Sequence, residues 1–488
     1  MNLTIIIQSL IAQLESFKKA FANLQLELFK KDETISSLTK SQRELLEEIE
    51  TLKNNQKKNS SNSSKPPSSD FGKPLQTKSL REKTGKNVGG QKGHKGTTLE
   101  FSSTPTQTLI HKVNVCNGCG DSLAKVVAHD FERRQVFDIP PIEMIVTEHQ
   151  CEIKGCPNCG LQNKGIFPEH VNQPVQYGNV IQTLAVYFTQ AQLLPYQRTS
   201  EIFKDLFNIK LSTSFLVNNN KRVANSLIPF IDNLKERLLN ASVLNADETG
   251  LNVGGKTYWL HTHCTKEYTF YEVHEKRGTE AMDAIGILPL YKGVLVHDFW
   301  KPYNTFDCKH QLCNVHHLRD LTFCHEVEGS EIAELLMYLL LDLNDKVREA
   351  KEAGNETLTK GQIQYWTKKF NNLVLEGFNK HPIAHKTEVK QGATKKSKTQ
   401  NMLLRFKDYK ESILGFIKNF NIPFGNNIAE QAIRMMKVKI KISGCFRSMQ
   451  GAQDFAYTRS YLATMKKQNQ PILAAIAAVI NGNPIIIT

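Results

Sequence analysis

The sequence predicts a multidomain α+β protein, and three observations support this. The first 52 residues carry an apolar heptad, two Cys-x-x-Cys pairs bracket short alternating segments, and residues 241–325 switch to strand-like patterning. The 488 residues suggest about three domains at roughly 150 residues each. The 62 Lys and Arg against 48 Asp and Glu favour polyanionic partners, nucleic acid first, although a Lys-rich solvated surface explains the excess equally well.

Composition also argues against several classes of protein. No apolar run reaches the roughly 18 residues of a membrane span. Residues 1–10 lack the basic start and the small-residue cleavage site of a secretory signal. Ten cysteines are too sparse for a disulfide scaffold. We therefore expect a cytoplasmic protein with reduced cysteines and no membrane partner.

Residues 1–52 are expected to form a coiled coil that pairs protomers, most simply as a homodimer. Two seam positions repeat every seven residues, twelve of their fourteen residues are apolar, and no Pro or Gly interrupts them. The seam consists of Ile7, Leu10, Leu14, Phe17, Phe21, Leu24, Leu28, Lys31, Ile35, Leu38, Gln42, Leu45, Ile49 and Leu52. A single helix that packs on its own chain is the alternative.

Residues 53–98 are expected to be a basic flexible linker. They hold eleven Lys and Arg against two acids, and Ser, Asn and Pro leave too little apolar area to fold alone. The segment ends in GGQKGHKG, where glycines would let the backbone approach a phosphate and Lys92 and Lys95 supply charge. A basic arm along DNA and a plain charged linker both fit.

Residues 99–175 are expected to be a zinc-ribbon-like module. Each Cys-x-x-Cys pair is followed by Gly, a turn that lets two thiolates face one tetrahedral metal ion. The four ligands would be Cys116, Cys119, Cys156 and Cys159, with Cys151 as a spare, and the segments VFDIP and MIVTEHQ between the pairs would be strands. Two unconnected thiol pairs are the alternative.

Residues 176–240 are expected to be helical, with a short break at 208–210 and a second helix capped by Ser212 or Thr213. Lys221 and Arg222 on that second helix suggest a helix-turn-helix unit that contacts DNA. Two ordinary core helices explain the pattern equally well.

Residues 241–328 predict three strands, a helix, a fourth strand and then a fifth strand running into a helix. Residues 329–420 are helical and basic near 386–398, and 421–488 hold further helices. Asp247 and Asp298 follow apolar strand runs, and Glu430 lies near the start of a helix that Asn426 or Asn427 could cap. Acids that meet at strand ends can bind Mg²⁺ or Mn²⁺, although single acids of this kind are common.

Arg434 and Lys437 share the helical face of Glu430, at spacings of four and seven residues. They could hold a DNA phosphate beside a metal ion, or form a surface salt-bridge ladder. His310, Cys313, His316, His317, Cys324 and His325 suggest a second metal cluster, but we interpret HQLCNVHHLRDL as the fifth strand and its helix. A more modest alternative to a second metal cluster is that His317 or Arg319 lies near the cleft where the acids would meet.

The chain resembles the large transposase of the insertion sequence 66 family. The matching text is spread over nearly the whole chain: KNSSNSSKPPSSD, GGQKGHKG, the paired CxxCG motifs, LPYQRTSEIF, NADETGLNV, VHDFWKPY, HQLCNVHHLRDL and NNIAEQAIR. The family is similar to other DDE transposases. The resemblance therefore implies a ribonuclease-H-like catalytic domain in 241–328 and 421–488, interrupted by an all-α insertion at 329–420.

The resemblance also implies a function. The catalytic triad would be Asp247, Asp298 and Glu430, preferred over Glu248 and Asp307, and two Mg²⁺ or Mn²⁺ ions would support 3′-end cleavage and strand transfer. Partners would be element ends, target DNA and accessory proteins of the same element, in a bacterial, nucleoid-associated enzyme. A catalytically silent DNA-binding regulator and a metal-dependent nuclease without strand transfer remain alternatives.

Overall fold

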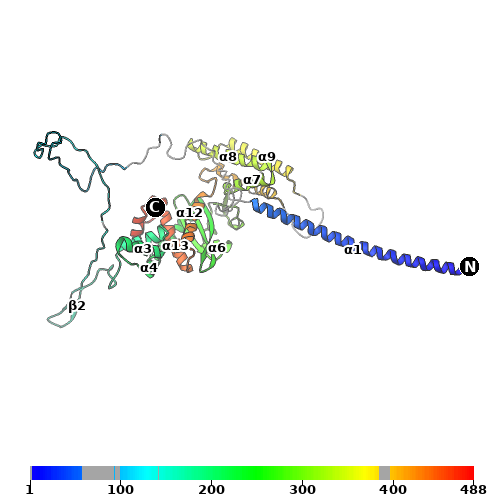
Figure 1. Ribbon diagram of the computed structural model, residues 1–488, viewed down its shortest axis with the longest axis horizontal. Coiled ribbons are helices and arrows are strands. Elements are labelled where there is room, and N and C mark those ends of the chain that lie inside the picture. Colours follow the sequence, from blue (N-terminus) through cyan, green and yellow to red (C-terminus); the bar gives the residue numbers. More distant parts are fainter. Residues whose placement is uncertain (1–2, 58–92, 94–98, 141, 384–395, 488) are drawn as a thin grey trace. The chain divides into compact units, whose positions relative to one another are not determined.

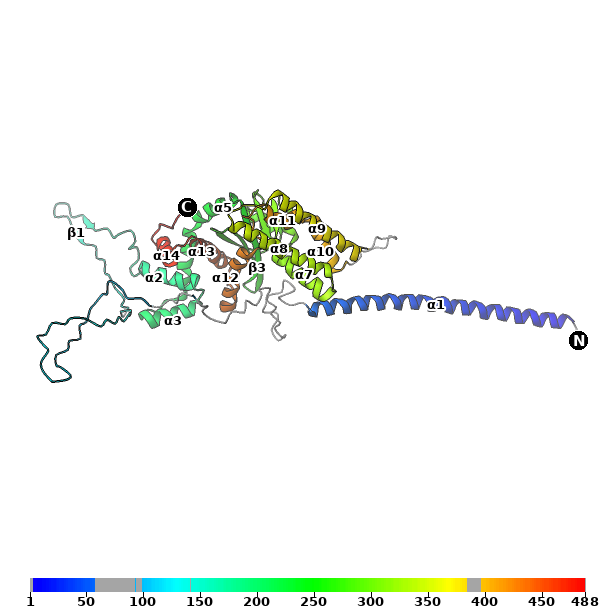
Figure 2. The ribbon, with the colours of Figure 1, turned by 90° about the horizontal axis from the view of Figure 1, so that it is seen from above.

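The computed structural model describes residues 3–57, 93, 99–140, 142–383 and 396–487 (Figures 1 and 2). The chain divides into two compact units. One comprises Met1–Thr77, Tyr177–Tyr196 and Ser214–Thr488, and the other comprises Lys78–Gln176 and Gln197–Thr213. Within the described ranges, no helix combines the length and the apolar character needed to cross a membrane.

The heptad segment forms a single helix, α1 (Leu3–Lys57), as Figure 2 shows. Its described apolar seam residues, from Leu14 to Leu52, are all exposed, and Phe17 is 80% exposed. An apolar stripe along a helix normally packs against another helix or against a core, so the exposed stripe of α1 is a surface for association.

The first unit is built on one five-stranded sheet. Its strands are β3 (Val243–Val253), β4 (Lys256–Cys264), β5 (Thr269–His274), β6 (Val294–His297) and β7 (Lys309–Leu312). They lie in the order β5-β4-β3-β6-β7, with β5, β4 and β3 antiparallel and with β3, β6 and β7 parallel. The β3–β4 turn contains Gly254 and Gly255 at φ 57° and 83°, which glycine adopts without steric cost.

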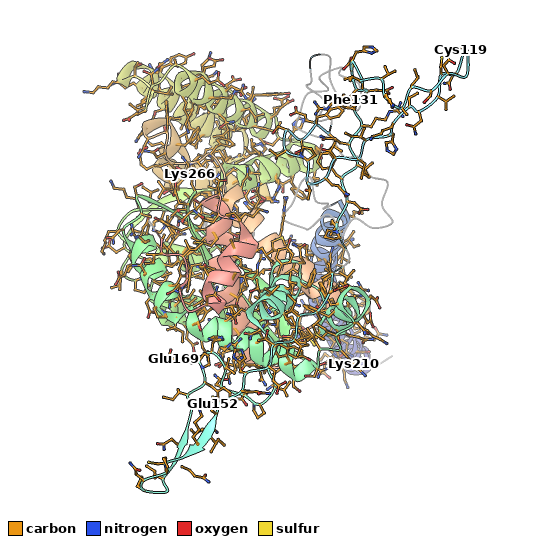
Figure 3. All side chains as sticks on the ribbon, turned by 90° about the vertical axis from the view of Figure 1, so that its left-hand side faces the viewer. Cys119, Phe131, Glu152, Glu169, Lys210 and Lys266 are labelled. Atoms are coloured by element: carbon orange, nitrogen blue, oxygen red, sulfur yellow. The ribbon has the colours of Figure 1, made fainter. Side chains whose placement is uncertain are left out.

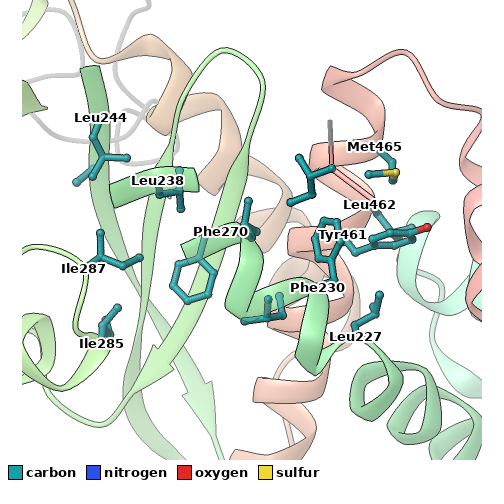
Figure 4. Close-up of a cluster of buried hydrophobic side chains, with 14 of the residues drawn as sticks. Leu227, Phe230, Leu238, Leu244, Phe270, Ile285, Ile287, Tyr461, Leu462 and Met465 are labelled. Carbon is teal, nitrogen blue, oxygen red and sulfur yellow. The ribbon is translucent and has the colours of Figure 1, made fainter. Parts of the chain in front are cut away.

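Helices bury one face of the sheet. Figure 4 shows Leu244 and Phe270 of the strands in one cluster with Phe230, Tyr461 and Met465. The helices that supply this cluster are α5 (Ile228–Leu239), α13 (Met449–Lys467) and α14 (Ile472–Ile480), and α6 (Thr279–Ile285) completes it between β5 and β6. Apolar burial of this kind provides the main stabilisation of the unit.

Helix α13 also covers the free edge of the sheet. The amides of Thr269, Tyr271 and Val273 on β5 donate to side chains of α13 at 2.9–3.1 Å. The acceptors are Thr464, Ser460 and Gln453. Alternate amides of an edge strand point away from the sheet, so these polar side chains replace a sixth strand and block edge-to-edge pairing.

The helical insertion has a core of its own. After α7 (Asn314–Glu328) come α8 (Glu331–Glu352), α9 (Lys360–Lys380), α10 (Lys398–Asp408) and α11 (Lys410–Lys418). Their apolar faces meet in one cluster that includes Leu336, Phe370 and Phe406. Part of the basic stretch predicted at 386–398 lies outside the described residues.

The predicted helical region 176–240 contains α2 (Asn179–Val186), a π-helical turn (Tyr187–Ala191), α3 (Tyr196–Phe207), α4 (Thr213–Ser226) and then α5. The break after α3 occurs at Asn208, which has φ 54°. Helix α4 buries Leu216 and Val223 and belongs to the first unit, whereas Gln197–Thr213 belongs to the second. Both α4 and α5 contribute buried residues to the core, and the helix-turn-helix interpretation stays a prediction.

Among its described residues, the second unit contains most of α3 and two short strands as regular structure. Its strands β1 (Ile153–Gly155) and β2 (Gln162–Lys164) are three residues long and pair antiparallel. The strands predicted for VFDIP and MIVTEHQ are wrong, since these residues are not in strands. Alternation predicts a strand only where a partner and a core exist, and here Val136 and Ile145 are 92% and 89% exposed. Figure 3 shows Cys119 and Phe131 on a part of the chain that has no helix or strand.

Candidate carboxylate and cysteine sites

Asp247 lies on β3, and Asp298 is the residue that follows the neighbouring strand β6. β3 and β6 pair in parallel up to Asn245 and Val296, so two further residues along each strand reach Asp247 and Asp298. Our expectation that Asp247 ends its strand is wrong. β3 continues to Val253 beside β4 after the shorter β6 has ended, and this leaves the β6 side of Asp247 without a paired strand.

Asn426 fastens the start of helix α12 (Asn427–Ser443) to the same strand. Its side chain donates to the carbonyl oxygen of Ala246 at 2.7 Å and accepts from the Asn245 side chain at 2.8 Å. Asn426 is 2% exposed and makes no side-chain cap to its own helix, contrary to the capping role we expected. Because Glu430 lies in the first turn of α12, these bonds hold it close to Asp247.

The charges of Asp298 and Glu430 both act on Asp247, although the three carboxylates are not among the described groups whose ligand atoms all lie within 4.8 Å of one another. The pKa of Asp247 is raised to about 8, first by burial and then by the charges of Glu248, Asp298 and Glu430, against a lowering hydrogen bond from the amide of Glu248. The amides of Glu248 and Trp300 donate to the carboxylates of Asp247 and Asp298, at 2.9 Å and 3.0 Å. Crowded carboxylates of this kind either retain a proton or bind a divalent cation.

The donor set fits hard divalent ions. Asp247, Asp298 and Glu430 offer carboxylate oxygens, which Mg²⁺ and Mn²⁺ prefer. The Oε1 atom of Glu430 is buried and has no hydrogen-bond partner among the described residues. A buried acceptor without a partner is costly, and a bound cation would satisfy it. These three residues are therefore the ones that could hold such ions.

Glu248 is neutralised by its own partners. Its carboxylate accepts from Arg277 Nη2 and Nε at 2.7 Å and 3.0 Å and from the hydroxyl of Tyr303. Arg277 lies between two rings, 4.8 Å from Trp259 and 4.0 Å from Trp300. A paired carboxylate is a poorer metal ligand than an unpaired one, so the geometry favours a supporting role for Glu248. The other rejected acid, Asp307, is 99% exposed and pairs with Lys292.

Two residues next to Glu430 were not among our predicted site residues. Cys313 precedes α7, and His316 lies in its first turn. Their ligand atoms lie within 4.8 Å of one another and of a Glu430 oxygen. The Cys-x-x-His spacing was visible in the sequence, but the distant Glu430 that completes the group was not.

The remaining members of the proposed histidine and cysteine cluster are dispersed. His310 bonds to His297 at 3.0 Å, and buried His317 bonds to Asn314 at 3.1 Å. Cys324 lies in the core of the insertion. Our interpretation of this stretch as a strand followed by a helix agrees with β7 and α7.

The predicted DNA-contacting residues have different environments. Arg434 and Lys437 are exposed on α12, within two turns of Glu430. Lys221 and Arg222 are exposed on α4, but Arg222 donates to Asn219 at 2.9 Å and to Gln182. Lys92 and Lys95 lie outside the described residues.

The four predicted zinc ligands form two similar turns. Gly120 donates to the carbonyl of Cys116 at 3.0 Å, and Gly160 donates to that of Cys156 at 2.9 Å, with φ of 84° and 69°. Hydrogen bonds within each turn lower the pKa of Cys116 and of Cys156. The structure does not bring the four sulfur atoms to one point, since the converging ligand group found among the described residues is the one around Glu430. Each turn presents a thiol pair suited to zinc.

Comparisons with known proteins identify the family. Residues 174–454 match the model "Transposase IS66 family", 114–160 match "zinc-finger binding domain of transposase IS66", and 7–100 match a family of unknown function (DUF6444). No curated protein matches.

Among solved structures, a chain of the simian T-cell lymphotropic virus intasome in complex with PP2A regulatory subunit B56 gamma is 12% identical over 34% of this chain. The match spans 55% of that chain with a TM-score of 0.13, so it carries no argument. The first family model, in contrast, covers more than half of the residues, and the chain therefore belongs to the Transposase IS66 family.

Proposed function

We propose that this chain cuts the ends of a mobile DNA element and joins them to target DNA at a site made of Asp247, Asp298 and Glu430. The observation that carries the proposal is the crowding around Asp247, whose pKa is raised by burial and by the charges of nearby acids, including Asp298 after β6 and Glu430 on a helix distant in sequence. Membership of the Transposase IS66 family supplies the substrate class.

The strand order supports a ribonuclease-H-like catalytic domain. Three antiparallel strands are followed by a helix and two parallel strands, and the first strand lies at the centre of the sheet. The four insertion helices α8–α11 lie between α7 and α12, so they separate Asp298 from Glu430 along the chain, and the charges of both acids still act on Asp247.

Each acid has a chemical role in the proposed reaction. Asp247 and Asp298 would bridge two Mg²⁺ or Mn²⁺ ions, and Glu430 would hold one of them and help to orient the nucleophile. Bound in pairs, such ions activate a water or a 3′ hydroxyl and stabilise the leaving oxygen on phosphorus. We propose in-line transfer with no covalent enzyme intermediate.

Binding of DNA would involve several parts of the chain. The exposed Arg434 and Lys437 could contact a phosphate beside the acids. The formal net charge of +14 favours association with DNA and with the nucleoid. The cysteine region, held by structural Zn²⁺ on Cys116, Cys119, Cys156 and Cys159, and the basic segment 53–98 would bind the element ends.

Helix α1 would pair protomers. Its exposed seam has the heptad spacing of a coiled coil, and synapsis of two element ends requires at least two copies of the active site. Accessory proteins of the same element are a further proposed class of partner.

The direct test is cleavage of labelled element-end DNA with Mg²⁺, followed by recovery of joined product. We expect Asp298→Asn to reduce cleavage by at least ~10³-fold, because a neutral amide is a poor ligand for a hard ion. The matched control is Asp307→Asn, since Asp307 is fully exposed and should be dispensable.

Undiminished cleavage by Asp298→Asn would remove that residue from the mechanism. DNA binding with no Mg²⁺-dependent nicking would favour the regulator, and cleavage without joined product would favour the nuclease.

A further inference from the structure

The group formed by Cys313, His316 and Glu430 has a composition unlike that of the carboxylate site. It offers one sulfur, one imidazole nitrogen and one carboxylate oxygen, all within 4.8 Å of one another. Mixed sulfur, nitrogen and oxygen donors select borderline ions such as Zn²⁺ and Co²⁺, whereas Mg²⁺ selects oxygen alone.

Two of these donor atoms lack other partners among the described residues. His316 Nδ1 and Glu430 Oε1 are both buried without a hydrogen bond. They lie 3.9 Å apart, too far for a hydrogen bond with each other. Two ligands of one tetrahedral zinc ion lie roughly 3.3–3.7 Å apart, so a small side-chain adjustment would let one ion satisfy both atoms.

The third donor is held rigidly. The amide of Asn426 donates to Cys313 Sγ at 3.1 Å, and the amide of Cys313 donates to the carbonyl of His297 at 2.9 Å. Gly425 permits this approach, because a Cβ atom there would lie 2.6 Å from Val315 Cγ2. The loop before α12 and the start of α7 are thus packed closely around the sulfur.

We propose that Cys313, His316 and Glu430 bind a zinc-class divalent ion next to the Mg²⁺ site and share Glu430 with it. The thiolate and the carboxylate would balance the charge of the ion, and the three protein ligands would leave a fourth position for water or a DNA phosphate.

Because the two metal sites would share Glu430, an ion in one site should affect the activity of the other. This inference about inhibition rests on the proposed function. An ion held by the sulfur and the imidazole would compete for Glu430 with the ions of the carboxylate site. Zn²⁺ should therefore inhibit cleavage that is measured in excess Mg²⁺.

Binding is tested with Co²⁺ as a spectroscopic probe on the full chain whose cysteine region is already loaded with Zn²⁺. A thiolate-to-cobalt charge-transfer band should appear in the wild type, disappear in Cys313→Ser and weaken at least ~10-fold in affinity in His316→Gln. The matched control is Cys445→Ser, because Cys445 is exposed and remote from this group. No band in the wild type, or an unchanged band in folded Cys313→Ser, would overturn the site.

Inhibition is tested separately. The Zn²⁺ concentration for half-inhibition should rise at least ~10-fold in Cys313→Ser and stay unchanged in Cys445→Ser. Equal inhibition in both variants would overturn the shared ligand. Cleavage with Mg²⁺ but no cobalt band would support the proposed function and overturn this metal site. A cobalt band without cleavage would support the metal site and overturn the proposed function.

Discussion

Asp247, Asp298 and Glu430 lie on or beside elements that are already packed, whereas Cys116, Cys119, Cys156 and Cys159 lie on two separate turns. The acids are supported by a sheet, by buried Asn426 and by helices on its faces. The cysteine region exposes most of its apolar side chains. From this difference we infer that packing organises the acid site, and we propose that the cysteine site would depend on a bound zinc ion for its organisation.

Breaking the cysteine site should give the largest effect. Replacing Cys116 and Cys156 by Ser, one from each turn, should lower zinc affinity by more than ~100-fold, because each loss removes a thiolate ligand. Metal analysis after dialysis measures this, and end-DNA binding should weaken in parallel. The control is Cys151→Ser, the spare cysteine, which should keep its zinc. Retention of zinc by the double variant would refute the site.

Removing the packing support of the acids should give the next largest effect. Asn426→Ala leaves the carbonyl of Ala246 and the amide of Asn245 without their partner and should cost about 2–3 kcal/mol of unfolding free energy. Displacement of Glu430 by about 1 Å would slow cleavage by roughly 100-fold. The control is Asn421→Ala, because Asn421 is exposed in the same loop. Denaturant unfolding and single-turnover cleavage measure the two effects.

This support shows what the sequence could and could not predict. The five strands, the helix between the third and the fourth, and the fifth strand leading into α7 follow from local apolar patterns, and they agree with the structure. The bonds from Asn426 to β3 span about 180 residues and have no local pattern. Sequence reasoning therefore offered Asn426 only as one of two candidate helix caps, with Asn427, because capping is the commoner local use of asparagine.

Contacts between residues distant in sequence limit the prediction at other positions as well. Ser460 and Thr464 look like unremarkable polar residues of a helix, and only the sheet edge explains their burial. The alternation in VFDIP and MIVTEHQ predicted strands, but a strand needs partners that the second unit does not provide. Cys313 and His316 showed ligand spacing, yet the third donor comes from another helix.

The crowding of the acids predicts a smaller, pH-dependent effect. The folded pKa of Asp247 is raised from its ordinary 3.8 to about 8, so between these values the folded state holds a proton that the unfolded state has released. Stability from this group is therefore fully present below about pH 3.8 and is lost as the pH rises towards 8. Asp247→Asn should raise the melting temperature by about 3 °C at pH 8 without metal.

The effect should shrink as the pH falls, because Asp247 in the wild type then becomes neutral like its amide replacement. Added Mg²⁺ should stabilise the wild type but not Asp247→Asn, which differential scanning calorimetry would detect. Equal melting temperatures for both proteins across this pH range would contradict the crowding.

Asp320 provides a contrast with Asp247 within the first unit. Its carboxylate is paired with cations, whereas Asp247 lies among other acids. Asp320 contacts Arg405 at 2.8 Å and Lys398 at 3.0 Å, both on α10. Burial alone would raise its pKa, but the charges of Lys398 and Arg405 outweigh burial and lower it below 3.8. The contribution of Asp320 to the free energy of unfolding is therefore present above about pH 3.8, and it is lost as the pH falls through the folded pKa of this carboxyl.

Asp320→Asn should cost about 1–2 kcal/mol of unfolding free energy at pH 7, since two cations lose a charged partner that remains partly accessible to solvent. The penalty should shrink below pH 4, the opposite pH dependence to that of Asp247→Asn. Urea unfolding at pH 7 and pH 3.5 measures both. The control is Asp345→Asn, which removes an exposed i,i+3 pair with Arg348 and should change stability by less than about 0.5 kcal/mol. A penalty for Asp320→Asn that grows on acidification would show that the ion pair does not hold α10 to α7.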